Sequence, residues 1–89
     1  MAKVVFTPNI QRHVGCPQAE AAGNTVREVL ERVFAENPRA RGYVLDDQSA
    51  LRRHMTIFVD GQMIRDRGRL ADTVNDNSTI HVFQALSGG

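Results

Sequence analysis

Apolar residues between positions 26 and 34 recur with the period of an α-helix. They fall at i, i+3, i+4, i+7 and i+8, namely Val26, Val29, Leu30, Val33 and Phe34. Thr25 and Glu28 have the spacing of a capping box, in which each side chain bonds a backbone N–H at the helix start. Asn37-Pro38 ends the pattern, because the residue before a proline is driven out of the α region. We therefore predict one main helix with one apolar stripe, which packs on one face of a sheet.

Three segments outside this helix have the composition of β-strands without an obvious hairpin partner. Residues 3–7 are β-branched and aromatic and stop at Pro8-Asn9. Residues 79–83 alternate, so that Ile80 and Val82 point inward while His81 and Phe83 point outward. A strand over residues 18–22 would be short or at an edge, because the proline before it cannot donate to a ladder.

A hairpin is the strongest short-range prediction. Asp60-Gly61 separates two apolar runs, and a type I′ turn needs positive φ at both central residues. A two-residue loop pairs Val59 with Gln62, Phe58 with Met63 and Ile57 with Ile64. This register places Ile57, Val59 and Ile64 under the helix, and Thr56, Phe58, Met63 and Arg65 on the opposite face.

The remaining stretches lack a clear period. We expect residues 10–14 to continue the first strand irregularly and residues 39–54 to form a long loop with one irregular turn. Leu70 and Val74 are expected anchors, and residues 75–78 have the composition of a turn.

Composition limits the possible functions. Eighty-nine residues make one domain, eleven basic side chains balance ten acidic ones, and Lys3 is the only lysine. We expect no nucleic-acid binding, no membrane span, no signal peptide and therefore a cytoplasmic protein. Cys16 is the only cysteine, and it is predicted to be a small apolar filler rather than a nucleophile. His13, His54 and His81 do not have metal-ligand spacing with it, so no metal site is predicted.

The last five residues, Ala-Leu-Ser-Gly-Gly, offer a different chemistry. The carboxylate of Gly89 follows two residues without side chains and can pass through a channel too narrow for any Cβ. Joined to AMP, it becomes a mixed anhydride that a sulfur or nitrogen nucleophile can attack. Gly89 and Gly88 are therefore the candidate reactive site, with residues 85–89 as a flexible functional tail. A frayed terminus or a cloning scar is the plainer explanation of the pair.

Two surfaces are candidates for partner binding. Large apolar side chains on an outward sheet face are expected only where a partner covers them, which favours Phe58, Met63 and Phe83, with Leu86 and Ser87 of the tail. The competing interpretation is that the faces are inverted and these residues form the core. Arginines at 52, 53, 65, 67 and 69 form either a basic rim for an acidic partner or a solvated loop face.

The order of elements and three motifs resemble the ubiquitin-like β-grasp sulfur carriers of the MoaD/ThiS group. This group includes the small subunit of molybdopterin synthase and the thiamine and cysteine sulfur carriers. The motifs are residues 57–61 (Ile-Phe-Val-Asp-Gly), 70–74 (Leu-Ala-Asp-Thr-Val) and 82–89 (Val-Phe-Gln-Ala-Leu-Ser-Gly-Gly), with a looser match over 7–13. Asn75-Asp76-Asn77 departs from the usual Asp-Gly-Asp, and Gln84 stands where proline is frequent. These departures leave the subfamily open.

The resemblance implies an α+β fold, a β-grasp roll whose mixed four- to five-stranded sheet packs on one main helix, over a single domain at 1–89. It implies that an adenylating enzyme uses ATP to make Gly89 an acyl adenylate, and that a sulfur donor then converts it to a thiocarboxylate. A sulfur-accepting synthase would use that sulfur in molybdopterin, thiamine or cysteine biosynthesis. The chain would bind no cofactor and would not itself be an enzyme, although it could be the non-catalytic small subunit of a synthase.

Two other classes remain open. One is a protein modifier of the ubiquitin type, joined through Gly89 to lysines of target proteins. The other is a non-covalent β-grasp interaction module in which the Gly-Gly pair is incidental, since a fold alone does not fix a function.

Overall fold

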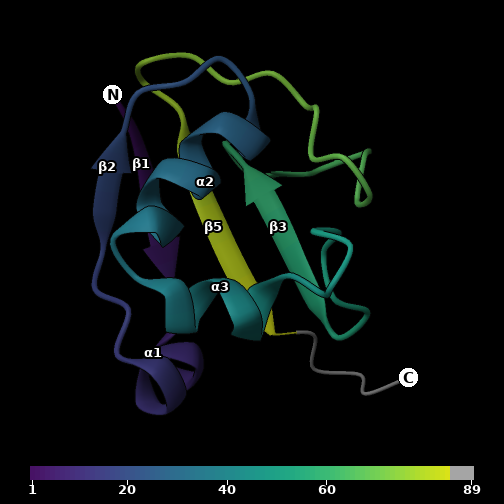
Figure 1. The fold of residues 1–89 in the computed structure, drawn as a ribbon. Helices are drawn as coiled ribbons and strands as arrows, with labels where there is room; N and C mark the ends of the chain where they lie inside the picture. The colour runs from purple at the N-terminus through teal and green to yellow at the C-terminus, as the bar shows by residue number, and fades with distance from the viewer. Residues whose placement is uncertain (85–89) are drawn as a thin grey trace.

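The first and last strands of the chain lie side by side near the middle of one sheet (Figure 1). The computed structural model describes residues 1–84. Its five strands are β1 (Ala2–Phe6), β2 (Ala19–Ala21), β3 (Met55–Val59), β4 (Gln62–Met63) and β5 (Thr79–Gln84), in the order β2-β1-β5-β3-β4. β1 and β5 are parallel, and the other neighbours are antiparallel. The sheet is therefore mixed, as the β-grasp prediction requires.

The main helix, α2 (Val26–Ala35), covers one face of this sheet. All five residues of the predicted apolar stripe are buried. The Thr25 hydroxyl accepts a hydrogen bond from the Glu28 backbone N–H at 3.2 Å. The Glu28 carboxylate accepts one from the Asn24 backbone N–H at 2.9 Å, one residue before the usual position in a capping box. The predicted helix and its cap are confirmed.

The hairpin has the predicted register. Phe58 pairs with Met63 and Val59 with Gln62, while the Ile64 N–H donates to the Ile57 carbonyl at 3.0 Å. Asp60 and Gly61 have φ values of 50° and 86°, as a type I′ turn requires. Leu70, one of the two predicted anchors, is fully buried, and the other, Val74, packs against the core.

Two short helices replace segments that were predicted to be irregular. α1 (Pro8–Val14) stands where the first strand was expected to continue, and α3 (Pro38–Val44) begins directly after α2. Both predictions are wrong for the same reason, because a proline that ends one element can also begin the next. Proline is also favoured in the first turn of a helix, where its missing N–H has no intrahelical acceptor. Asn37 caps α3 by accepting a hydrogen bond from the Ala40 N–H at 3.3 Å.

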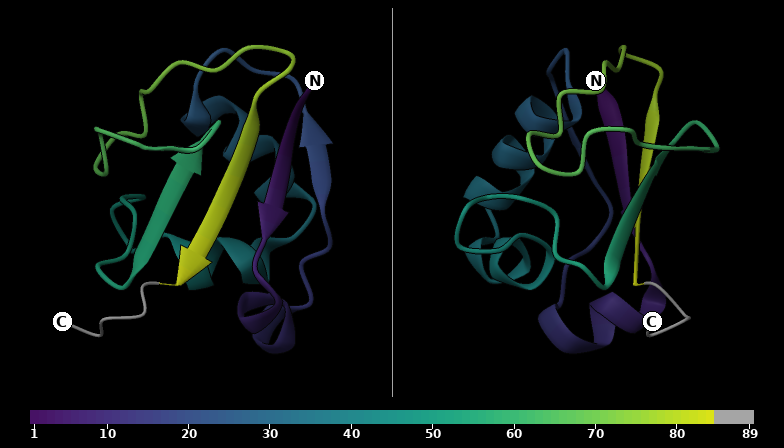
Figure 2. Two further views of the ribbon diagram at one scale, coloured as in Figure 1. Left: turned by 180° about the vertical axis from the view of Figure 1, so that it is seen from behind. Right: turned by 90° about the vertical axis from the view of Figure 1, so that its right-hand side faces the viewer.

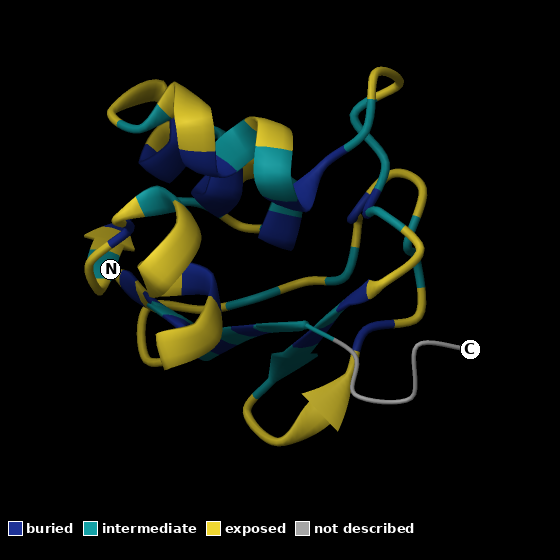
Figure 3. Cartoon of the chain, turned by 90° about the horizontal axis from the view of Figure 1, so that it is seen from below, coloured by how far each residue is buried: buried dark blue, intermediate teal, exposed yellow. Residues whose placement is uncertain are grey.

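α1 buries one side chain and α3 buries two, so they extend the core at the end of the sheet where β5 finishes. Ile10 of α1 and Ala40 and Val44 of α3 are fully buried. The buried sides of the helices face the sheet in Figure 3. The second predicted strand is confirmed as β2, a three-residue edge strand. No helix within residues 1–84 is long and apolar enough to cross a membrane.

Arginine side chains hold the long connections together. Nη2 of Arg67 lies 2.8 Å from the Arg52 carbonyl oxygen, 3.3 Å from that of Arg53 and 2.7 Å from that of Met55. Arg27 reaches from α2 to the carbonyls of Ser49, Gly68 and Arg69. A guanidinium presents several N–H donors in a fixed plane, which a lysine does not. The preference for arginine in this sequence therefore has a structural use.

The half-buried Arg67 can be tested against an exposed neighbour. Arg67→Met keeps most of the apolar stem but removes one donor from three carbonyls, of which that of Arg52 still accepts a hydrogen bond from the Met55 N–H at 2.9 Å. We expect the free energy of unfolding to fall by about 1–3 kcal/mol. Arg53→Met, at an exposed position, should change it by less than about 0.5 kcal/mol. Urea unfolding of both variants measures the difference, and equal midpoints would contradict the structural role of Arg67.

Candidate functional site

One face of the sheet carries no helix of the described chain. In Figure 2, α2 and α3 lie on one side of the strands and the other side is open. Alternation along β3 and β5 directs Ile57, Ile80 and Val82 toward the helices, and all three are fully buried. Their neighbours Phe58, His81 and Phe83 point the other way and are half-buried. The predicted assignment of faces is confirmed, and the competing interpretation, with these aromatic residues in the core, is wrong.

The outward residues form one continuous cluster. Phe58 lies directly opposite His81 in the β3–β5 pairing, and Phe83 is the next outward residue along β5. The rings of Phe58 and Phe83 meet edge to face with centroids 5.3 Å apart, and the His81 ring lies 6.0 Å from that of Phe83. Met63, the partner of Phe58 in β4, is 58% exposed. We call Phe58, Met63, His81 and Phe83 the aromatic face.

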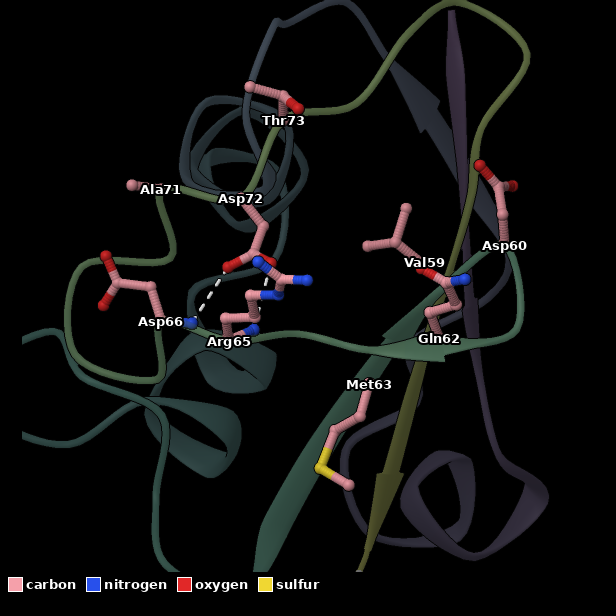
Figure 4. A pocket seen from close by; sticks show the side chains of 9 residues that line it. All are labelled: Val59, Asp60, Gln62, Met63, Arg65, Asp66, Ala71, Asp72 and Thr73. Atoms are coloured by element: carbon pink, nitrogen blue, oxygen red, sulfur yellow. Dashed lines mark hydrogen bonds between the residues drawn. The ribbon is translucent and has the colours of Figure 1, made fainter.

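A hollow of about 710 Å³ adjoins Met63 at the edge of the sheet (Figure 4). Three aspartates line it, and each already serves a backbone N–H. Asp72 accepts hydrogen bonds from the N–H groups of Arg65 and Asp66 at 3.0 and 2.9 Å. Asp60 accepts one from Thr79 at 2.9 Å, and Asp66 one from Arg69 at 2.8 Å. These carboxylates stabilise the turns that surround the hollow.

Cys16, Glu31 and Arg41 have shifted pKa values, and burial or hydrogen bonding explains each shift. Burial raises the pKa of the Cys16 thiol, which is 1% exposed, and this disfavours the thiolate that a nucleophile needs. The prediction that Cys16 is an apolar filler is confirmed. The hydrogen bond from Arg41 lowers the pKa of Glu31, and the same bond raises the pKa of Arg41. Across residues 1–84, no three His, Cys, Asp or Glu side chains come close enough to hold a metal ion.

The arginines predicted as a possible rim divide into two groups. Arg67 and Arg52 donate to backbone carbonyls, Arg52 to that of Gly42 at 2.9 Å, and both are half-buried. Arg53, Arg65 and Arg69 are exposed. Part of the predicted rim is therefore internal structure.

The tail itself lies outside the described residues. This applies to Leu86, Ser87, Gly88 and Gly89, whose predicted roles stay predictions. Gln84 is the last described residue, and its side chain contacts Asn9 of α1 and Tyr43 of α3. β5 ends beside these two helices (Figure 1). The strand that leads into the tail is thus held between β1 and β3.

Sequence reasoning missed two residues that the structure brings to these regions. His81 is predicted to point outward but is absent from the predicted docking residues. The signal for it was its spacing of two residues from Phe83, which places both side chains on the same face of β5. Tyr43 fell in the predicted loop, yet it lies on α3 within 3.5 Å of the Gln84 side chain. The signal for Tyr43 was Asn37-Pro38, which has the composition of a helix start.

Comparison with known proteins gives the family. The sequence matches the model of the ThiS family over residues 10–89. Among solved structures, a chain of the BexX/CysO complex of Amycolatopsis orientalis is 24% identical with a TM-score of 0.82, over 100% of both chains. CysO of Mycobacterium tuberculosis is 22% identical with a TM-score of 0.79, over 97% of this chain and 100% of its own.

The small archaeal modifier protein 1 of Methanosarcina acetivorans is 24% identical with a TM-score of 0.78, over 99% of this chain and 95% of its own. A search of curated proteins gave no match. At these identities the structural likeness establishes the β-grasp fold, and the sequence match establishes the family. The chain belongs to the ThiS family, the ubiquitin-like β-grasp sulfur carriers whose fold it shares.

Proposed function

We propose that this protein is a sulfur carrier that works through the carboxylate of Gly89. The observation that carries the proposal is the place of β5. A strand held on both sides, between β1 and β3, leads directly into a segment that ends in Gly-Gly. Such a mount holds the last described residue, Gln84, on a rigid body, so an enzyme that modifies the end of the chain can dock on that body next to the start of the tail.

The proposed chemistry has two steps and uses ATP that the activating partner binds. The Gly89 carboxylate attacks the α-phosphate of ATP, forming an acyl adenylate and releasing pyrophosphate. A sulfur nucleophile then attacks the acyl carbon and displaces AMP. With sulfide, the product is the thiocarboxylate directly; with an enzyme persulfide, a thiol must also cleave the S–S bond. The carrier contributes the acyl group and a docking surface, and the partners contribute the catalytic side chains.

The aromatic face is the proposed docking surface for the adenylating enzyme. It offers two contacting phenylalanine rings and an exposed methionine on the side of the sheet away from α2. Aromatic residues and methionine are enriched at protein interfaces. The face also includes Phe83, next to Gln84, so a partner seated on it would be close to the start of the tail.

A protein modifier is the second candidate function. The likeness to a small archaeal modifier protein supports a shared fold and, by analogy, activation of the same carboxylate. The single lysine argues against chain building, because polymers of a modifier need acceptor amines on its own surface. Attachment of one copy to another protein's lysine stays compatible with the sequence. If the protein is a sulfur carrier, the enzyme that accepts its sulfur determines whether the pathway is molybdopterin, thiamine or cysteine biosynthesis.

The role of the tail is tested by deleting Gly89 or changing Gly88→Val. Either change should abolish ATP-dependent AMP formation, because the acyl group is lost or a side chain blocks a narrow channel. The melting temperature should stay nearly unchanged. Gly42→Val is the matched control, since nothing lies within 4 Å of a Cβ added at Gly42. Undiminished AMP formation by the deletion variant would exclude activation at Gly89.

The docking role is tested by Phe58→Asp and Phe83→Asp. Each should weaken binding to the activating enzyme by more than about 1 kcal/mol, as removal of an interface anchor does. Ala35→Asp adds the same charge at an exposed position of α2, which lies on the other side of the sheet from the aromatic face. This variant should bind the activating enzyme normally. Affinities measured by calorimetry give the comparison, with circular dichroism to confirm folding. If Phe58→Asp and Ala35→Asp bound equally well, docking on the aromatic face would be refuted.

A further inference from the structure

Side chains from two different helices meet the side chain of the last described residue of β5. Nδ2 of Asn9, on α1, donates a hydrogen bond to Oε1 of Gln84. The hydroxyl of Tyr43, on α3, lies 3.5 Å from the same oxygen. Two elements that are far apart in the sequence therefore converge on one acceptor atom at the point where the chain leaves the sheet.

Tyr43 is itself held in place by aromatic neighbours. The His13 ring stacks on it with centroids 5.6 Å apart and planes at 19°, and the His54 ring approaches edge-on at 6.4 Å. His13 belongs to α1 and His54 precedes β3, so Tyr43 is fixed from two sides. A tyrosine oriented in this way loses little further freedom when its hydroxyl engages Gln84.

α1 is also tied to the sheet at this end. The Thr7 N–H donates to the Val82 carbonyl at 3.3 Å, and Gln11 Nε2 donates to the Phe6 carbonyl at 2.9 Å. Asn37 Nδ2 lies 3.5 Å from the Gly15 carbonyl and links the end of α1 to the start of α3. The two helices that contact Gln84 are therefore linked to each other, and α1 is also hydrogen-bonded to the sheet.

These contacts contribute little to the stability of the fold. Asn9 is exposed, and Tyr43 and Gln84 are only half-buried. A solvated hydrogen bond between side chains is largely exchanged for bonds to water on unfolding, so its net contribution is small. What the contacts do restrict is the backbone at the end of β5, because Gln84 is bound through its side chain as well as paired with Met55.

We propose that Asn9, Tyr43 and Gln84 form a tail anchor that sets the direction in which residue 85 and those after it leave the domain. Its consequence for activation rests on the proposed function. An enzyme that takes up the tail must order it, and each rotatable group that is already fixed lowers that entropic cost. The three side chains are positioning residues, and none of them is proposed to touch the reacting atoms.

The anchor is tested first without any partner. Backbone ¹⁵N relaxation is measured on the full chain for the wild type, Gln84→Ala, Asn9→Ala and Gln84→Glu. Gln84→Ala and Asn9→Ala should lower the order parameter of the Ala85 amide, while Gln84→Glu should preserve it because a carboxylate oxygen still accepts both bonds. Gln18→Ala is the control, since Gln18 is exposed and its side chain makes no hydrogen bond within residues 1–84. Melting temperatures of all variants should agree closely.

Equal order at Ala85 in the wild type and Gln84→Ala would overturn the anchor. So would Gln84→Glu behaving like Gln84→Ala, because the effect would then not depend on the acceptor oxygen. The double variant Asn9→Ala/Gln84→Ala should have the same order parameter at Ala85 as Gln84→Ala, since both changes remove the hydrogen bond between Asn9 and Gln84.

The consequence for activation is tested with the adenylating enzyme encoded in the same genome, by following pyrophosphate release. Gln84→Ala should raise KM for the carrier roughly two- to tenfold and leave kcat unchanged, as expected for lost preorganisation rather than lost chemistry. An unchanged KM would overturn this consequence. If the wild type is not activated at all, the proposed function fails, whereas the order parameter of Ala85 still decides the anchor.

Discussion

Two parallel strands cannot be joined by a hairpin, so β1 and β5, which are neighbours in the sheet, must be connected by the long segment between them. That segment supplies the three helices, the two edge strands and β3. Because α2 and α3 lie on one face, the opposite face stays open for a partner (Figure 2). The same pairing places β5 between β1 and β3, so the chain enters its final residues from a firmly held strand. The core, the open face and the start of the tail all follow from this one arrangement.

Polar side chains of residues 1–84 are largely used to hold this arrangement. Asp60, Asp66 and Asp72 stabilise turns, while Arg27 and Arg67 bind the carbonyls of long loops. The Arg69 N–H, as a donor, lowers the pKa of the Asp66 carboxyl. Hydrogen-bond partners account for the shifted pKa values of Glu31, Arg41 and Asp66, and burial accounts for that of Cys16.

Sequence reasoning succeeded where one local pattern determines the result. The stripe of α2, the Asp60-Gly61 turn and the alternation of β5 each predicted the correct face, because burial on one side fixes helix phase and strand register. It failed at Pro8 and Pro38, where the same residue can end one element or begin the next. The choice is made by tertiary packing, since Ile10 and Val44 are fully buried only once the sheet exists. The contacts of Asn9 and Tyr43 with Gln84 could not be predicted either, because Gln84 lies 75 residues after Asn9 and 41 residues after Tyr43.

We propose that Gly89 carries sulfur. Intact-mass analysis of the protein isolated from its native cell, or treated with its activating enzyme, ATP and a sulfur source, tests this most directly. We expect one oxygen-to-sulfur exchange at Gly89, which reverts to the carboxylate when the acceptor enzyme and its substrate are added. Recovery of Gly89 mainly as isopeptides on lysines of other proteins, with no thiocarboxylate, would rule out the sulfur carrier and identify a protein modifier.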